Sequence, residues 1–196
     1  MNKEDLVSVI MPTYNAGKYL ADSINSILNQ SYKNLELLIT DDASTDPTTL
    51  QLLQEFASKD NRVDILYLKE NHGAGYARNK SIERAKGRYI AFCDSDDRWT
   101  TDKLEKQIAF MNKKKCALSC ASYIIFDGET QNEIGFCTAP KKITYGMMKR
   151  DNKVGCLTAI YDVQMLGRKF FMPTIRKRQD WALFLQIEVE ALTKHK

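Results

Sequence analysis

Apolar and polar residues alternate with two different periods over the first 115 residues of the chain. Four short runs rich in Val, Ile, Leu and aromatic residues predict β-strands over 6–14, 35–40, 63–68 and 89–93. Between and after them, apolar residues recur every three or four positions, which predicts helices over 18–30, 47–57, 76–85 and 101–114. Strands that alternate with helices are typical of a mostly parallel sheet that carries helices on both faces.

The pattern changes after residue 115. Two apolar runs, 117–126 and 133–138, flank a turn at Asp127–Gly128 and predict an antiparallel pair of strands. A short helix over 144–150, a strand over 157–161 and an amphipathic helix from Gln179 onwards are expected to follow. We therefore predict a single α/β domain in two parts, residues 1–115 and a smaller, more irregular part over 116–196.

The composition suits one globular domain. The chain has 196 residues, 43% of them hydrophobic, and no apolar run approaches the ~20 residues that a membrane-spanning helix needs. Acidic residues precede the first apolar run and no small-residue cleavage site follows it, which predicts a first strand and not a signal peptide. The five cysteines form no C-x-x-C pair, which favours buried free thiols and a cytoplasmic protein.

The net charge of +4 divides unevenly along the chain. Residues 1–140 hold 17 Lys and Arg against 20 Asp and Glu, a balance of −3, whereas residues 141–196 hold 12 against 5, a balance of +7. The basic part could contact an anionic acceptor, or act as a peripheral contact with an anionic membrane on its inner face. A solvated basic surface explains the same charges equally well.

Polar and acidic residues follow three of the predicted strands at the point where each strand ends. The first strand ends in residues 12–15 (PTYN), the second in Asp41 and Asp42, and the fourth in residues 94–97 (DSDD). The carboxyl ends of parallel strands meet at one edge of a sheet, where α/β proteins bind ligands. A solvated loop explains any one of these clusters, but it explains their coincidence poorly.

The segment 94–97 concentrates three carboxylates within four residues directly after a core strand. Such carboxylates repel one another and resist burial. Asp94 and Asp96 offer the hard oxygen ligands that Mg²⁺ or Mn²⁺ prefers, and these ions commonly combine one or two carboxylates with substrate phosphates. We therefore expect Mn²⁺ or Mg²⁺ to bind here together with a diphosphate substrate.

Other kinds of site fit the same residues less well. An EF-hand loop that began at Asp94 would place Trp99 where glycine is required. The segment 73–78 (GAGYAR) lacks the third glycine of a dinucleotide fingerprint, no Walker A motif is present, and the two histidines cannot build a Ser-His triad. A receiver domain would use Asp41 and Asp42 as its acidic pocket, but it leaves the carboxylates after the fourth strand unexplained.

Five motifs occur together and in order: VSVIMPTYN, LLITDDASTD, GAGYARN, GRYIAFCDSDDRW followed by KLEKQ, and RQDWALFL. With them the chain resembles a family 2 glycosyltransferase of the GT-A fold over about residues 7–187. The resemblance implies a Rossmann-like nucleotide-sugar-binding half over 1–115 and an acceptor-side half over 116–196. It implies a hexosyltransferase that moves a sugar from a nucleotide-diphosphate donor, expected to be a UDP-sugar, to an acceptor hydroxyl with inversion. A saccharide or lipid-linked acceptor, polysaccharide biosynthesis for the cell envelope and no nucleic-acid partner are implied as well.

The resemblance also assigns roles to individual residues. Nucleotide-sugar binding is implied for Pro12, Thr13, Tyr14, Asn15, Asp42, Arg78, Asp94 and Ser95. Tyr14 would stack on the uracil, and Arg78 would lie near the diphosphate. Asp96 would bind the metal directly, Asp94 would contact the ribose or the metal shell, and Asp97 has a less defined role.

Asp180 matches the catalytic base of the family. A sugar hydroxyl is a poor nucleophile at neutral pH, and a carboxylate that removes its proton accelerates attack by about 10²–10⁴-fold. The simpler interpretation is an acid that only stabilises a helix dipole, by roughly 0.3–1 kcal/mol. Two departures, Gln179 where many relatives have Glu and the end of the chain at Lys196, favour an alternative: a truncated or degenerate module that binds nucleotide sugar without turnover. A nucleotidyltransferase is the third hypothesis, but residues 11–20 lack its glycine- and lysine-bearing phosphate loop.

Overall fold

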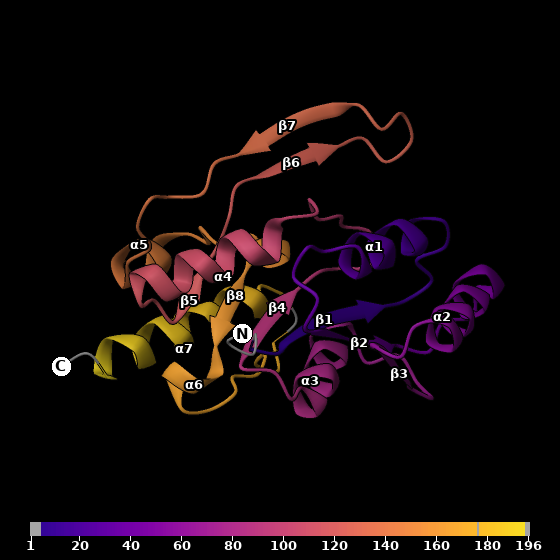
Figure 1. The fold of residues 1–196 in the computed structure, drawn as a ribbon, viewed down its shortest axis with the longest axis horizontal. Coiled ribbons are helices and arrows are strands. Elements are labelled where there is room, and N and C mark those ends of the chain that lie inside the picture. Colours follow the sequence, from indigo (N-terminus) through magenta and orange to yellow (C-terminus); the bar gives the residue numbers. More distant parts are fainter. Residues whose placement is uncertain (1–4, 176, 195–196) are drawn as a thin grey trace.

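The computed structural model describes residues 5–175 and 177–194, and a six-stranded sheet forms the centre of the fold (Figure 1). The strand order is β3–β2–β1–β4–β8–β5. Four strands lie parallel to one another: β1 (Val7–Thr13), β2 (Leu35–Asp41), β3 (Val63–Tyr67) and β4 (Tyr89–Phe92). β8 (Ile160–Asp162) is antiparallel to β4, and β5 (Leu118–Ser119) is antiparallel to β8.

Helices cover both faces of this sheet. One face packs against α1 (Tyr19–Leu28), α2 (Pro47–Lys59) and α4 (Lys103–Lys114). The other packs against α3 (Ala74–Arg84), α5 (Tyr145–Arg150), α6 (Val163–Leu166) and α7 (Gln179–Lys194). Successive side chains of a strand point to opposite faces, so Val9 and Met11 of β1 belong to the first core and Ile10 to the second. The predicted α/β domain with a mostly parallel sheet is confirmed.

Local sequence signals fix where several elements begin. α2 begins at Pro47 because the Oδ2 of Asp46 accepts a hydrogen bond from the backbone N of Thr49 at 2.8 Å. Before β4, Gly87 passes so close to β1 that a Cβ there would lie 2.7 Å from the backbone O of Leu6 and the backbone N of Ser8. This close approach brings β4 into register with β1 and so sets the position of the acidic segment that follows β4.

The second part of the chain differs from the sequence prediction in detail. The apolar run 117–126 is not one strand, because its start forms β5 in the main sheet and its end forms β6 (Tyr123–Phe126). β6 pairs with β7 (Glu133–Cys137) as an antiparallel hairpin, as predicted, and the hairpin stands apart from the main sheet beside α4 (Figure 1). The strand predicted over 157–161 is wrong at its start, where residues 156–158 form a 3₁₀ turn (Cys156–Thr158) before β8. The short helix α6 was not predicted.

All five cysteines are free thiols, but only Cys93 is fully buried, and Cys137 is exposed on the hairpin. The expectation that the thiols are buried is therefore wrong for Cys137. Within the described residues, none of the helices combines the length and the apolar character needed to cross a membrane.

Candidate functional site

The ends of β1, β2 and β4 and the start of α3 enclose a pocket of about 170 Å³, here called the strand-end pocket. It is lined by Pro12, Thr13, Tyr14, Asp42, Ala74, Arg78, Asp94 and Ser95. Every residue for which the sequence implied nucleotide-sugar binding therefore lines this pocket, except Asn15. Ala74 lines it too and was not anticipated, because a small apolar residue at a helix start carries no chemical signal.

Asn15 lies beside the pocket and holds two loops together. Its backbone is left-handed, with a φ of 48°, and its Oδ1 accepts hydrogen bonds from the backbone N of Thr45 at 2.8 Å and of Asp46 at 2.9 Å. Its own backbone N donates to the Oγ of Ser44 at 2.9 Å. The side chain thus ties the end of β1 to the loop between β2 and α2, which supports the shape of the pocket from outside.

Asp42, on the wall of the strand-end pocket, also holds a loop in place through hydrogen bonds. Its side chain is buried, and its two oxygens accept hydrogen bonds from the backbone N of His72 at 2.9 Å and of Gly73 at 2.7 Å. Gly73 has a φ of 88°, a conformation that favours glycine, and α3 begins directly after it. Asp42 therefore fixes the loop that positions the first turn of α3 at the pocket.

Arg78 and Asp94 form an ion pair at the floor of the strand-end pocket. The Nη2 of Arg78 donates to both carboxylate oxygens of Asp94 at 2.7 Å, and 11% of the Arg78 side chain is exposed against 30% for Asp94. Burial opposes the charge of Arg78, but the Asp94 carboxylate outweighs it and raises the pKa of the guanidinium above its usual value. Asp94 is consequently neutralised by an arginine, which limits how strongly it can bind a metal ion at the same time.

Two polar groups of the strand-end pocket have no protein partner. The buried Oγ1 of Thr13 and the buried Nε of Arg78 make no hydrogen bond to any described residue. Buried polar groups in native proteins are nearly always satisfied by protein, water or ligand. A donor and a hydroxyl left over in one pocket fit a polar, hydrogen-bonding ligand.

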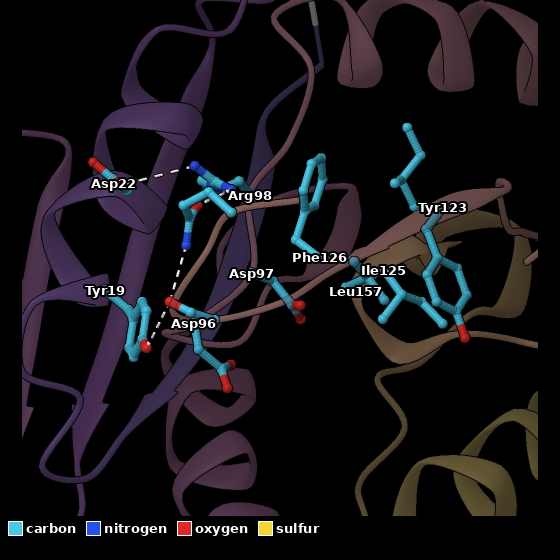
Figure 2. Close-up of a pocket in the computed structure, with 12 residues that line it drawn as sticks. Tyr19, Asp22, Asp96, Asp97, Arg98, Tyr123, Ile125, Phe126 and Leu157 are labelled. Atoms are coloured by element: carbon cyan, nitrogen blue, oxygen red, sulfur yellow. Dashed lines mark hydrogen bonds and ion pairs between the residues drawn. The ribbon is translucent and has the colours of Figure 1, made fainter. Parts of the chain in front are cut away.

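Asp96 and Asp97 line a second pocket of about 430 Å³, here called the carboxylate pocket. Figure 2 shows the two carboxylates between Tyr19 of α1 on one side and Ile125 of the hairpin on the other. Asp96 is exposed, and its carboxylate accepts no hydrogen bond from the described residues. Partial burial and then the neighbouring charges of Asp94 and Asp96 raise the pKa of Asp97 to about 7.

This charge arrangement fits a divalent cation. Carboxylates whose charge raises the pKa of the neighbouring Asp97 are a set that a cation would stabilise. Within the described part of the chain, no three Asp, Glu, His or Cys side chains gather as a complete ligand set. Mg²⁺ and Mn²⁺ do not require one, because they commonly bind one or two carboxylates and take their other ligands from substrate phosphates and water. Asp96 is the carboxylate best placed to hold such an ion, since Asp94 is already paired.

Asp180 lies in the first turn of α7, and its Oδ2 accepts a hydrogen bond from the Nδ2 of Asn152 at 3.0 Å. The negative charge of Asp180 contributes to raising the pKa of Arg78, because Asp180 lies near that guanidinium. Asp180 nevertheless lines neither pocket. The neighbouring Gln179 packs directly on Gly75 in the first turn of α3, where any larger residue would collide with it. The start of α7 thus contacts the start of α3, the helix that carries Arg78. Sequence reasoning did not identify Asn152, because a single asparagine in a loop gives no signal.

The arrangement can hold a molecule with three kinds of group. The strand-end pocket offers hydrogen-bond partners and the exposed ring of Tyr14. Asp96 and Asp97 offer negative charge for a cation, and Asp180 offers a carboxylate that can accept a proton. The arrangement therefore combines a polar pocket, a group of carboxylates suited to a cation and a further carboxylate on α7.

Comparison with known proteins identifies related chains. The family model described as "Glycosyl transferase family 2" matches residues 8–171. TuaG of Bacillus subtilis, whose name assigns it to teichuronic acid biosynthesis, is 43% identical over 194 residues, which are 99% of this chain and 76% of TuaG. WfgD of Escherichia coli, named UDP-Glc:alpha-D-GlcNAc-diphosphoundecaprenol beta-1,3-glucosyltransferase, is 41% identical over 182 residues, which are 93% of this chain and 69% of WfgD.

Solved structures share the fold. TarS of S. aureus in complex with UDP has a TM-score of 0.74 and 25% identity, and the alignment covers 94% of this chain and 55% of that one. The mannosyltransferase PcManGT from Pyrobaculum calidifontis, in complex with GDP-Man and Mn²⁺, has a TM-score of 0.67 and 20% identity, over 92% of this chain and 51% of that one. The chain thus spans about half the length of these two solved chains.

Proposed function

The chain belongs to glycosyl transferase family 2, and on that premise we propose that it transfers a sugar from a UDP-sugar to a hydroxyl of a lipid-linked saccharide. The observation that carries this proposal is the strand-end pocket, where residues from three strand ends and one helix surround unpaired polar groups beside a cluster of carboxylates. The name of WfgD supports the donor and acceptor classes, and the complex of TarS with UDP supports the nucleotide.

In the proposed complex, Tyr14 stacks on the uracil and Arg78 with Thr13 contacts the ribose and phosphate oxygens. Asp96 would hold Mn²⁺ or Mg²⁺ beside the strand-end pocket. The ion, when bound, neutralises charge on the departing UDP. Arg78 keeps its ion pair with Asp94 at the floor of the pocket, so its buried charge is balanced. The free edge of the guanidinium can then donate hydrogen bonds to the phosphates.

The transfer is a single displacement. The acceptor hydroxyl loses its proton to a carboxylate oxygen of Asp180, its oxygen forms a bond to the anomeric carbon, and the bond from that carbon to the phosphate oxygen breaks on the opposite face. The anomeric centre is thereby inverted. Asn152 is a positioning residue, because its hydrogen bond to Oδ2 orients Asp180 and leaves Oδ1 available for the proton.

A second candidate function is a module that binds the donor without turnover. The observation in its favour is that Asp180 lines neither the strand-end pocket nor the carboxylate pocket. Both candidates require donor binding, and they differ in whether sugar is transferred at all.

Calorimetry with UDP tests the proposal of donor binding. We expect UDP to bind in the presence of Mn²⁺ and to bind much more weakly in EDTA, because Asp96 would hold the ion and the ion would neutralise charge on the diphosphate. Asp96→Asn should reduce the affinity in Mn²⁺ and change it little in EDTA. Asp22→Asn, which also removes a carboxylate that lines the carboxylate pocket, is the matched control and should bind UDP as the unmodified protein does. Equal affinity of the unmodified protein in Mn²⁺ and in EDTA would contradict the role of the ion, and no UDP binding in either condition would contradict the function.

A further inference from the structure

Helix α4 and the β6–β7 hairpin enclose a groove of about 850 Å³, here called the hairpin groove. Phe110 of α4 faces it from one side, and Ile124, Phe126 and Phe136 face it from the hairpin. Ile124 and Phe136 are direct cross-strand partners, so their side chains share one face of the hairpin. Phe136 is 64% exposed and Phe110 is 48% exposed. A concave, aromatic surface of this kind left open to water marks a binding site.

One lysine nitrogen in the groove has no hydrogen-bond partner among the described residues. The Nζ of Lys103 is buried, makes no hydrogen bond to any described residue, and lies 4.0 Å from the centroid of the Trp99 ring. Burial lowers the pKa of Lys103 to about 7. Lys106, one turn away, is instead paired with Asp102. Lys103 is therefore a group in the groove whose charged form an anionic ligand would stabilise.

The hairpin groove continues into the carboxylate pocket. Residues that line both are Arg98, Tyr123, Ile124, Phe126, Gln131 and Leu157. Figure 2 shows several of these side chains on the hairpin side of Asp96 and Asp97. The shared residues thus join an aromatic groove that contains Lys103 to a pocket bordered by Asp96 and Asp97.

We propose that the hairpin groove binds the lipid part of the acceptor, with the hydrocarbon chain between α4 and the hairpin and a phosphate group at Lys103. The saccharide then extends past the carboxylate pocket toward Asp180. This inference rests on the proposed function, which supplies the acceptor class. An aromatic groove, a lysine within it and an adjoining pocket bordered by carboxylates match the hydrocarbon chain, the phosphate and the sugar of such a molecule. A polypeptide would bring backbone groups that need hydrogen-bond partners, which the aromatic walls do not supply, whereas a prenyl chain needs none.

The test is calorimetry with three soluble probes: farnesyl phosphate, farnesol and inorganic phosphate. UDP and Mg²⁺ are present at saturation, so that the donor pocket is occupied. We expect farnesyl phosphate to bind with a stoichiometry of one and about tenfold more tightly than either fragment, because it alone engages both the aromatic walls and Lys103. Phe136→Ser should weaken its binding by about tenfold, since the ring is only partly covered in the free protein. Lys103→Met should abolish the preference for farnesyl phosphate over farnesol.

The control variant is Ile134→Ser, because Ile134 is an exposed residue of the same hairpin that does not line the groove. It should bind farnesyl phosphate as the unmodified protein does, and all three variants should keep their UDP affinity. If UDP binds but farnesyl phosphate does not, or if Phe136→Ser and Lys103→Met leave its affinity unchanged, the groove is not a lipid site although the proposed function stands. If UDP itself fails to bind, the proposed function fails first.

Discussion

The ion pair between Arg78 and Asp94 should be one of the strongest side-chain couplings in the protein. Arg78→Met removes the counterion of the Asp94 carboxylate, whose side chain is 30% exposed. Asp94→Asn removes the counterion of the Arg78 guanidinium, whose side chain is 11% exposed. Breaking a buried pair costs about 3–5 kcal/mol. Because Asp94 retains some contact with water, we expect each single substitution to lower the free energy of unfolding by about 2–3 kcal/mol.

The double variant Arg78→Met, Asp94→Asn leaves neither charge unpaired. We expect it to be less destabilised than the sum of the two single variants by about 2 kcal/mol, within the range found for contacting residues. Urea unfolding in EDTA measures all four proteins without interference from metal. Lys80→Met is the control, because it removes an exposed pair with Glu83 on the same helix and should cost less than about 0.5 kcal/mol. Additive effects in the double variant would refute the assigned coupling.

Three further results are expected. Gly87→Ala should destabilise the protein by about 1–3 kcal/mol in thermal unfolding, because its Cβ would collide with β1, whereas Gly146→Ala in α5 meets no atom and should be neutral or stabilising. Burial lowers the pKa of Lys103 to about 7, so between pH 7 and 10.5 the unfolded chain binds more protons than the folded protein. The free energy of unfolding should therefore rise with pH over that window. Lys103→Met should remove this rise, and Lys106→Met should keep it. If the basic charge of residues 141–196 faces a membrane, the protein should sediment with anionic vesicles at low salt and be released at high salt, and absence of any retention would leave a solvated surface as the explanation.

The sheet and its carboxyl edge could be predicted because each rests on a local pattern. The apolar run of β1 and the acids after β4 are contiguous in sequence, and parallel topology brings all such strand ends to one edge. The residues implied for the nucleotide pocket therefore converge, apart from Asn15. Their functional roles remain predictions until a ligand is bound.

The rest depends on packing between distant segments. The choice of Arg78 as the partner of Asp94, and of Asn152 as the partner of Asp180, follows from how α3 and α7 are placed, which no local spacing encodes. The apolar run 117–126 is equally apolar in β5 and in β6, so only the available partner strands decide where it divides. The hairpin groove arises from the same division, because β6 leaves the main sheet and faces α4.

The central claim is that the protein transfers sugar with Asp180 as the base. The most direct test compares Asp180→Asn with the unmodified protein in two measurements, Mn²⁺-dependent affinity for the UDP-sugar donor and the rate of sugar transfer when chemistry is limiting. We expect unchanged donor affinity and a rate lower by about 10²–10⁴-fold, because asparagine keeps the size of the side chain but cannot accept a proton. Glu190→Gln in the same helix, which removes an exposed ion pair with Arg168, should change neither value. Transfer by Asp180→Asn at the original rate would contradict the account.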